Sequence, residues 1–169
     1  QRDRPFGIVE YVIPAFRIPD AAIRRDYEMA LAMGVAFRFG TDEGDNVAAL
    51  RKAYDYVVLA TGAWKEGAPV VDAGNELVLD ALDFLLESKA KGCKVALGKR
   101  VAVVGGGDVA MDCARAAKRA PGVENVTLVY RRTRQFMPAE REEIELALAD
   151  GVEVIELQAP KRFDGSTLC

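Results

Sequence analysis

The sequence predicts an α/β fold built on a parallel β-sheet, and three observations predict it. From residue 99 onward, apolar strand-like runs alternate with stretches of helical periodicity, and strands separated by helices pair in parallel. A glycine-rich turn joins the first of these runs to the helix that follows it. Half of the 169 residues are apolar and 29% are charged, which is the balance of a folded globular protein.

The amino-terminal part of the chain has a less regular pattern. Residues 1–19 contain several prolines around a short apolar run, which predicts irregular structure and excludes a helix there. A helix is predicted to start with Asp20 as its N-cap and to end at Gly34. The other elements predicted for this part are a strand at 35–39, a turn-rich stretch at 40–46, a buried strand at 54–60 and a linker at 67–74.

The second half of the chain is predicted to alternate between helices and strands. Leucines recur on one face of the first helix, and Pro138 suits the first turn of the last one. The predicted order is helix 78–91, strand 101–104, helix 107–119, strand 126–130, helix 138–149 and strand 152–157. This succession needs helical crossovers between parallel strands.

The turn after strand 101–104 has the G-x-G-x-x-A spacing of a dinucleotide-binding site. Its residues are Gly105, Gly106, Gly107, Asp108, Val109 and Ala110. Gly105 permits a tight turn, Gly107 lacks the Cβ that would block a pyrophosphate, and Ala110 lets the helix pack closely. Free amides at the helix start favour phosphate. The alternative is a glycine-rich turn with no ligand, and Asp108 is interpreted as a structural carboxylate that bonds backbone amides.

The residues after strand 126–130 indicate which dinucleotide the turn would bind. A site for NAD has an acidic residue there, which holds the ribose 2′-hydroxyl. This chain instead has Arg131 and Arg132, with Arg134 close behind. Guanidinium groups pair with a 2′-phosphate through charge-assisted hydrogen bonds. The sequence therefore predicts NADP(H), and the alternative is a solvated basic turn.

The composition excludes several classes of function. A net charge of −3 at pH 7 provides no basic field for nucleic-acid binding. Because the chain has no histidine, Ser-His-Asp catalysis and histidine metal sites are excluded within it. The three cysteines lie far apart, so no metal site is expected, and reduced thiols indicate a cytoplasmic protein. No apolar run approaches the length of a membrane span.

With these motifs identified, the chain resembles the glutamate synthase small-subunit-like family of FAD/NAD(P)H oxidoreductases, of the pyridine nucleotide-disulphide oxidoreductase type. Within that family it is most similar to flavin subunits of the selenate reductase type. The resemblance rests on residues 6–8, 13–18, 105–115, 130–132, 137–138 and 141–143. It lacks the family's first FAD fingerprint and its cysteine cluster, so we expect a fragment of a longer protein.

The resemblance implies two cofactor domains. Residues 1–75 would form the C-terminal part of an FAD-binding domain, and residues 76–169 the first half of an inserted NADP(H)-binding Rossmann domain. Ala60, Thr61 and Gly62 match an Ala-Thr-Gly signature that lies against the flavin. Three residues near the amino terminus either approach the flavin or form a packed loop, and these are Pro14, Phe16 and Arg17. Of the acidic pair Glu142 and Glu143, at least one is expected on a solvated helix face.

The implied activity is that of an NADPH-dependent flavin oxidoreductase. Hydride would pass from NADPH to FAD, and electrons would continue to an iron–sulfur centre or a partner subunit. No catalytic acid or base is needed in this chain for that step. Two other hypotheses stay open, namely a flavin-free NADP-dependent dehydrogenase and a non-catalytic dinucleotide-binding module. The isolated fragment is expected to be inactive and to self-associate through uncovered apolar surface.

Overall fold

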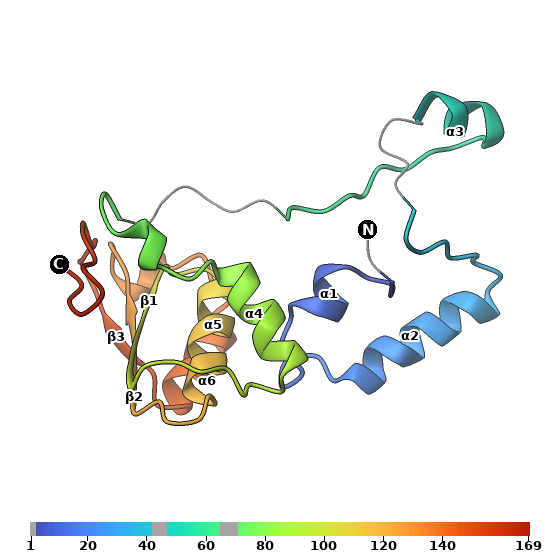
Figure 1. The fold of residues 1–169 in the computed structure, drawn as a ribbon. Helices are drawn as coiled ribbons and strands as arrows, with labels where there is room; N and C mark the ends of the chain where they lie inside the picture. The colour runs from blue at the N-terminus through green and yellow to red at the C-terminus, as the bar shows by residue number, and fades with distance from the viewer. Residues whose placement is uncertain (1–2, 42–46, 65–70) are drawn as a thin grey trace.

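The structure joins a helical amino-terminal part to a parallel sheet with helices packed beside it (Figure 1). It is a computed structural model and describes residues 3–41, 47–64 and 71–169. The α-helices are α1 (Ile8–Tyr11), α2 (Asp20–Ala32), α3 (Val47–Ala53), α4 (Ala81–Ala90), α5 (Asp108–Lys118) and α6 (Arg141–Ala149). The strands are β1 (Arg100–Val104), β2 (Asn125–Val129) and β3 (Glu153–Ile155), and the short 3-10 helices are η1 (Asn75–Leu77) and η2 (Arg134–Phe136).

The sheet has the order β1-β2-β3 and both pairings are parallel. Val104 at the end of β1 lies opposite Val129, and Val129 lies opposite Ile155 at the end of β3. The three strands therefore end at one edge of the sheet, where the loops into α5 and η2 begin. This architecture confirms the predicted α/β class with parallel pairing and is consistent with a Rossmann-like dinucleotide-binding domain.

The core lies between the sheet and α5. Val126 and Leu128, alternate residues of β2, are completely buried because alternate side chains of a strand point to the same face. Helix α5 presents small buried side chains to this face, and they are Cys113, Ala114, Ala116 and Ala117. Small side chains let the helix backbone approach the strands closely. Ala110, which was predicted to let the helix pack closely, packs against this core.

Two predictions for the amino-terminal helices were wrong in detail. Residues 1–19 were expected to contain no helix, but α1 forms one turn between Pro5 and Pro14. Because both prolines fall outside that turn, neither removes one of its hydrogen bonds. Asp20 is the first residue of α2 rather than its N-cap, and the cap position belongs to Pro19, which makes no side-chain capping bond.

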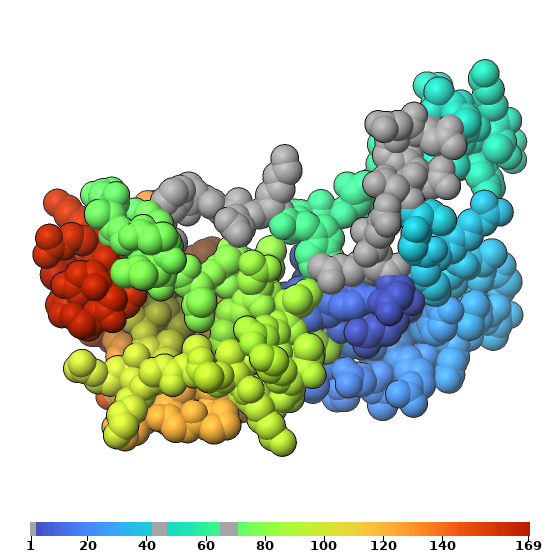
Figure 2. Space-filling model, viewed as in Figure 1, coloured from blue at the N-terminus to red at the C-terminus, as the bar shows by residue number. Residues whose placement is uncertain are grey.

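The strands predicted at 35–39 and 54–60 are not formed. In the described part of the chain neither segment has a neighbouring strand, and neither is assigned to a helix or a strand. Within 54–60, Tyr56 is 90% exposed and Val58 is 86% exposed, so the expected burial is also absent. Residues 42–46 of the predicted turn-rich stretch and residues 67–70 of the predicted linker lie outside the described residues. Figure 2 shows the residues of α3 projecting from the rest of the molecule.

Helix α4 is shorter than the predicted 78–91 because a capping residue fixes its start. The carboxylate of Asp80 accepts the backbone N–H groups of Leu82 and Asp83, at 2.8 and 3.1 Å. These bonds satisfy amides that have no partner inside the helix. No helix in the described part of the chain is long and apolar enough to cross a membrane.

Residues 71–77 lie beside the C-terminal residues 161–169 (Figures 1 and 2). Phe163 donates its backbone N–H to Ala73 at 3.0 Å. Between them Gly74 has φ +87°, and a Cβ there would lie 1.8 Å from the carbonyl oxygen of Phe163. Only glycine lets the two backbones come this close.

Replacing Gly74 by alanine is expected to separate these two segments. The amide of Phe163 should lose its protection in hydrogen exchange, while the amides of β2 keep theirs, because the pairing lies outside the core. Gly122→Ala is the matched control, since Gly122 has φ +82° but a Cβ added there would meet no atom within 4 Å. Equal loss of protection at Phe163 in both variants would contradict the role of the close approach.

Candidate functional site

The glycine turn is held between the end of β1 and the start of α5. Gly105 adopts φ +144°, a conformation that strains other residues, and donates its N–H to Val129 at 3.1 Å. A Cβ on Gly105 would lie 3.3 Å from the Cβ of Ala110, so small residues are needed at both positions. Gly107 occupies the N-cap position of α5 and makes no side-chain cap.

The amino end of α5 presents unpaired backbone donors. The N–H groups of Ala110 and Met111 both donate to the carbonyl of Gly107, at 2.9 and 3.2 Å. Among the described residues, no acceptor is found for the amides of Gly106, Gly107, Asp108 and Val109. A Cβ on Gly107 would meet only the Cγ of Pro138, at 3.9 Å, so this face of the turn is open. Open donors and a helix amino terminus together can hold a phosphate group.

The loop after β2 packs against the other side of the turn. A Cβ on Gly106 would lie 2.6 Å from the ring of Tyr130 and 3.1 Å from the Cγ of Met137. The hydroxyl of Tyr130 donates to the carbonyl of Phe136 at 2.8 Å, and Ala139 donates its N–H to Gly106 at 3.1 Å. The missing side chain of Gly106 therefore leaves room for Tyr130 and Met137, a packing role that was not predicted from the sequence.

Asp108 has a structural partner. Its carboxylate accepts the backbone N–H of Glu140 at 3.0 Å, across 32 residues of sequence. Residues 138–140 are thus held against the turn, and α6 begins at Arg141 instead of at Pro138 as predicted. The interpretation of Asp108 as a carboxylate that bonds backbone amides agrees with this contact, although the amide belongs to the neighbouring loop.

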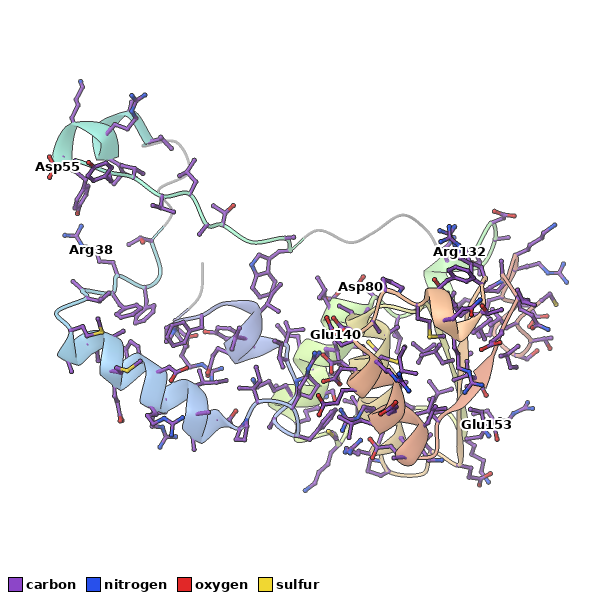
Figure 3. All side chains as sticks on the ribbon, turned by 180° about the vertical axis from the view of Figure 1, so that it is seen from behind. Arg38, Asp55, Asp80, Arg132, Glu140 and Glu153 are labelled. Carbon is purple, nitrogen blue, oxygen red and sulfur yellow. The ribbon has the colours of Figure 1, made fainter. Side chains whose placement is uncertain are left out.

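The structure brings Arg131 and Arg132 to the same edge of the sheet as the glycine turn. Both side chains are exposed and follow Val129, which lies opposite Val104. Figure 3 shows Arg132 at the opposite end of the sheet from Glu153, the first residue of β3. Neither arginine has a side-chain partner in the described part of the chain.

Arg134, by contrast, is engaged. Its Nε and its backbone N–H both donate to Oε1 of Glu156, at 2.8 and 2.9 Å. The backbone donor first, and the guanidinium second, hold the pKa of Glu156 below its ordinary range. A shallow depression of about 320 Å³ lies beside this pair and is lined by Thr133, Arg134, Gln135 and Glu156.

Ala60, Thr61 and Gly62 lie apart from the glycine turn. They are exposed and belong to the extended segment that runs from α3 towards α1 (Figure 1). Trp64 packs between this segment and the amino terminus, because Cβ atoms placed on Gly62 and on Gly7 would each lie 3.5 Å from its indole. Residues 60–62 belong to no strand of the described part of the chain, so a flavin site is not assembled from them alone.

A network of charged residues, of which Asp112 and Arg115 are buried, joins the amino-terminal segment to α5 and α6, and it was not predicted from the sequence. Its members are Arg17, Asp112, Arg115, Arg119, Glu143 and Asp150. Glu142 is exposed and Glu143 is not, which agrees with the expectation that at least one of them is solvated. The spacing of the charged residues in α5, at positions i, i+3 and i+7, was the available signal, since it places them on one helix face.

The charges shift several pKa values. Burial raises the pKa of the Asp112 carboxyl, and the hydrogen bond from Arg17 opposes that effect only in part. Burial also acts to raise the pKa of Asp150, but hydrogen bonds from Arg119 and Arg115 outweigh it and hold the pKa below the ordinary value. Burial raises the pKa of the Cys113 thiol to about 12, so this cysteine stays protonated and unreactive at neutral pH.

Pro14, Phe16 and Arg17 form a packed loop on these helices. Pro14 is buried, and the ring of Phe16 lies 4.8 Å from the guanidinium carbon of Arg115. Of the two interpretations of this segment, packing is the one that its contacts support. No cluster of three or more potential metal ligands was found in the described part of the chain.

The chain is similar in sequence, over most of its length, to parts of longer known proteins. Protein YgfK of Escherichia coli (strain K12) is 47% identical over 159 aligned positions, which cover 94% of this chain and 15% of YgfK. The glutamate synthase (NADPH) small chain of Azospirillum brasilense is 35% identical over 98% of this chain and 37% of its own length. The NADP(+)-dependent formate dehydrogenase subunit beta of Moorella thermoacetica is 38% identical over 86% of this chain and 21% of its own.

The chain thus spans less than two fifths of the length of each of these relatives. The match to a protein family extends over most of this chain. The model of the family described as pyridine nucleotide-disulphide oxidoreductase matches residues 21–167. The relatives include glutamate synthase small chains, in agreement with the resemblance identified from the motifs. By this match the chain belongs to the pyridine nucleotide-disulphide oxidoreductase family.

Proposed function

We propose that this chain is the NADP(H)-binding part of an NADPH-dependent flavin oxidoreductase. The observation that supports the dinucleotide site most directly is that backbone N–H groups without an acceptor and guanidinium groups without a partner, both among the described residues, occur at the same edge of the sheet. The amides of residues 106–109 and the residues Arg131 and Arg132 lie at the same edge of the sheet. A dinucleotide carries phosphate at both corresponding positions, namely the diphosphate and the ribose 2′-phosphate.

In this proposal the residues bind and orient the nucleotide. The backbone of Gly106 to Val109 holds the diphosphate, with the open face of Gly107 allowing its close approach. Arg131 and Arg132 bind the 2′-phosphate, while Arg134 stays paired with Glu156 and positions the loop. When bound, NADPH supplies a hydride, and the protein contributes position and electrostatics rather than an acid or base.

The flavin and the electron acceptor belong to the same proposal. Family membership and the Ala60-Thr61-Gly62 match support FAD as the hydride acceptor, with residues 1–75 and 76–169 as parts of the two cofactor domains. Relatives named as a small chain and a subunit beta support transfer onward to an iron–sulfur centre or partner subunit. The likeness to selenate-reductase-type flavin subunits stays a prediction.

The NADP(H) assignment is tested by titrating 2′,5′-ADP and 5′-AMP into the chain by calorimetry. The wild type should prefer 2′,5′-ADP, and Arg131→Ala with Arg132→Ala should remove that preference. Each hydrogen bond to a charged group contributes about 1.5–3 kcal/mol, so the affinity of the double variant for 2′,5′-ADP should fall about 100-fold or more. The 5′-AMP affinity should change little.

Arg141→Ala is the matched control, because the Arg141 side chain is 93% exposed and, among the described residues, it pairs with Glu145 alone, on the surface of α6. It should leave both affinities unchanged. Equal wild-type affinity for the two ligands would overturn the NADP(H) assignment. The flavin is tested separately in the full-length protein, where absence of flavin absorbance would favour a flavin-free dehydrogenase.

A further inference from the structure

Arg17 makes ion pairs with two helices of the nucleotide-binding half at once. Its Nη1 lies 2.9 Å from Oδ2 of Asp112 in α5, and its Nε lies 3.1 Å from Oε1 of Glu143 in α6. The other carboxylate oxygen of Glu143 lies 3.2 Å from Nη1 of Arg115. We call the two ion pairs of Arg17 the Arg17 clamp. The clamp spans 95 residues of sequence between Arg17 and Asp112.

The segment that carries Arg17 is itself fixed in place. The backbone N–H of Arg17 donates to the carbonyl of Pro14 at 2.9 Å, and Pro14 is buried. The ring of Phe16 lies 4.8 and 4.2 Å from the guanidinium carbons of Arg115 and Arg119. These contacts hold the backbone of the segment against α5, so the guanidinium of Arg17 approaches its carboxylates from a defined direction.

We propose that Arg17 is a positioning residue that holds the dinucleotide-binding helix α5 at a fixed place relative to the flavin-side segment of the protein. The proposal rests on the proposed function, in which residues 1–75 belong to the flavin-binding domain and the glycine turn binds NADP(H). Because Asp112 lies one turn after Asp108 in the same helix, fixing Asp112 also fixes the amino end of α5.

The chemistry of the clamp favours positioning over simple stabilisation. Buried ion pairs are often no more stabilising than apolar side chains of the same volume, but they specify one geometry. Asp112 is 4% exposed, and its Oδ1 is buried with no hydrogen-bond partner in the described part of the chain. An unsatisfied buried oxygen costs stability. A joint selected for stability alone would be better served by apolar residues.

Position matters here because hydride transfer is sensitive to distance. In the proposed protein the donor and the acceptor are held by different parts of the chain, and a displacement of about 1 Å can cost about 100-fold in rate. The clamp joins those two parts through the planar guanidinium of Arg17, whose N–H groups point at two carboxylates in fixed directions. Loosening it should therefore slow the transfer without weakening the binding of NADP(H).

The test compares Arg17→Leu, Arg17→Lys and Arg4→Leu. Arg4 is the matched control because it lies in the same part of the chain and pairs with Glu10 beside it. In the 169-residue chain, Arg17→Leu should raise hydrogen exchange at residues 13–18 at least about tenfold, and the affinity for 2′,5′-ADP should stay within about twofold. In the flavin-loaded full-length protein, flavin reduction at saturating NADPH should fall at least about tenfold. Arg17→Lys should restore part of both losses, and Arg4→Leu should match the wild type.

Two results would overturn the proposal, namely unchanged exchange at residues 13–18, or looser exchange with an unchanged rate of flavin reduction. If Arg17→Leu does not fold, Asp112→Asn removes the same ion pair from the side of α5 and takes its place. Failure of the proposed function has a different signature. The wild-type chain would then not bind 2′,5′-ADP, whatever the exchange at residues 13–18.

Discussion

Replacing Arg115 by methionine should lower the free energy of unfolding by about 3 kcal/mol, at the lower end of the range for breaking a buried ion pair. Arg115 is 6% exposed and donates from Nε to Asp150 at 2.8 Å and from Nη1 to Glu143 at 3.2 Å. Methionine fills similar volume but leaves both carboxylates with one partner fewer. The loss is not larger because Arg119 still pairs with Asp150, and Arg17 with Glu143.

Urea denaturation measures this loss, and Arg119→Met serves as the matched control. Arg119 pairs with the same Asp150, but its side chain is 33% exposed, so the expected loss is only about 1 kcal/mol. An equal loss in the two variants would contradict the importance of burial. The pH dependence provides a second check. Because the pKa of Asp150 is lower in the folded protein than its ordinary value of 3.8, its ion pairs stabilise the fold at pH values above 3.8, and this stabilisation is lost as the pH falls below that value. The stabilisation that acid removes should be smaller in Arg115→Met, because one of the partners of Asp150 is absent there.

The second half of the fold was predictable because its signals are local and its partners are present. Strand β2 was predicted from an apolar run, and the neighbouring strands β1 and β3 pair with its backbone on both sides. The run at 54–60 carries an equally clear signal, but a strand forms only where another strand satisfies its N–H and C=O groups. No such neighbour occurs in the described part of the chain, so Tyr56 and Val58 are exposed.

The candidate site shows the same division. The glycine turn and the arginines after β2 follow from residues close in sequence, within one strand-helix-strand unit. The Arg17 clamp joins residues 95 positions apart, and nothing in the local pattern around Arg17 indicates Asp112 as its partner. The packing of Tyr130 on Gly106 was missed for a related reason, because the turn was interpreted only as a ligand site.

Replacing Gly106 by alanine should lower both stability and nucleotide affinity. The new Cβ would lie 2.6 and 2.7 Å from two carbons of the Tyr130 ring, closer than real Cβ contacts allow. The ring is held by its hydroxyl bond to Phe136 and cannot turn aside without breaking it. We expect a loss in the upper part of the range for overpacking, about 1–3 kcal/mol. The affinity for 2′,5′-ADP should fall at least about tenfold, because the shift disturbs the adjacent amides.

Gly107→Ala separates the two reasons for glycine in this turn. Its Cβ would meet only Pro138 at 3.9 Å and its φ is −94°, so the unfolding free energy should change by less than about 0.5 kcal/mol. The same Cβ would occupy the open face that the diphosphate approaches, and the affinity for 2′,5′-ADP should fall as in Gly106→Ala. Thermal denaturation of both variants measures the change in stability, and calorimetry measures the change in affinity for 2′,5′-ADP. If Gly107→Ala retained full affinity, the open face of the turn would not be the phosphate site.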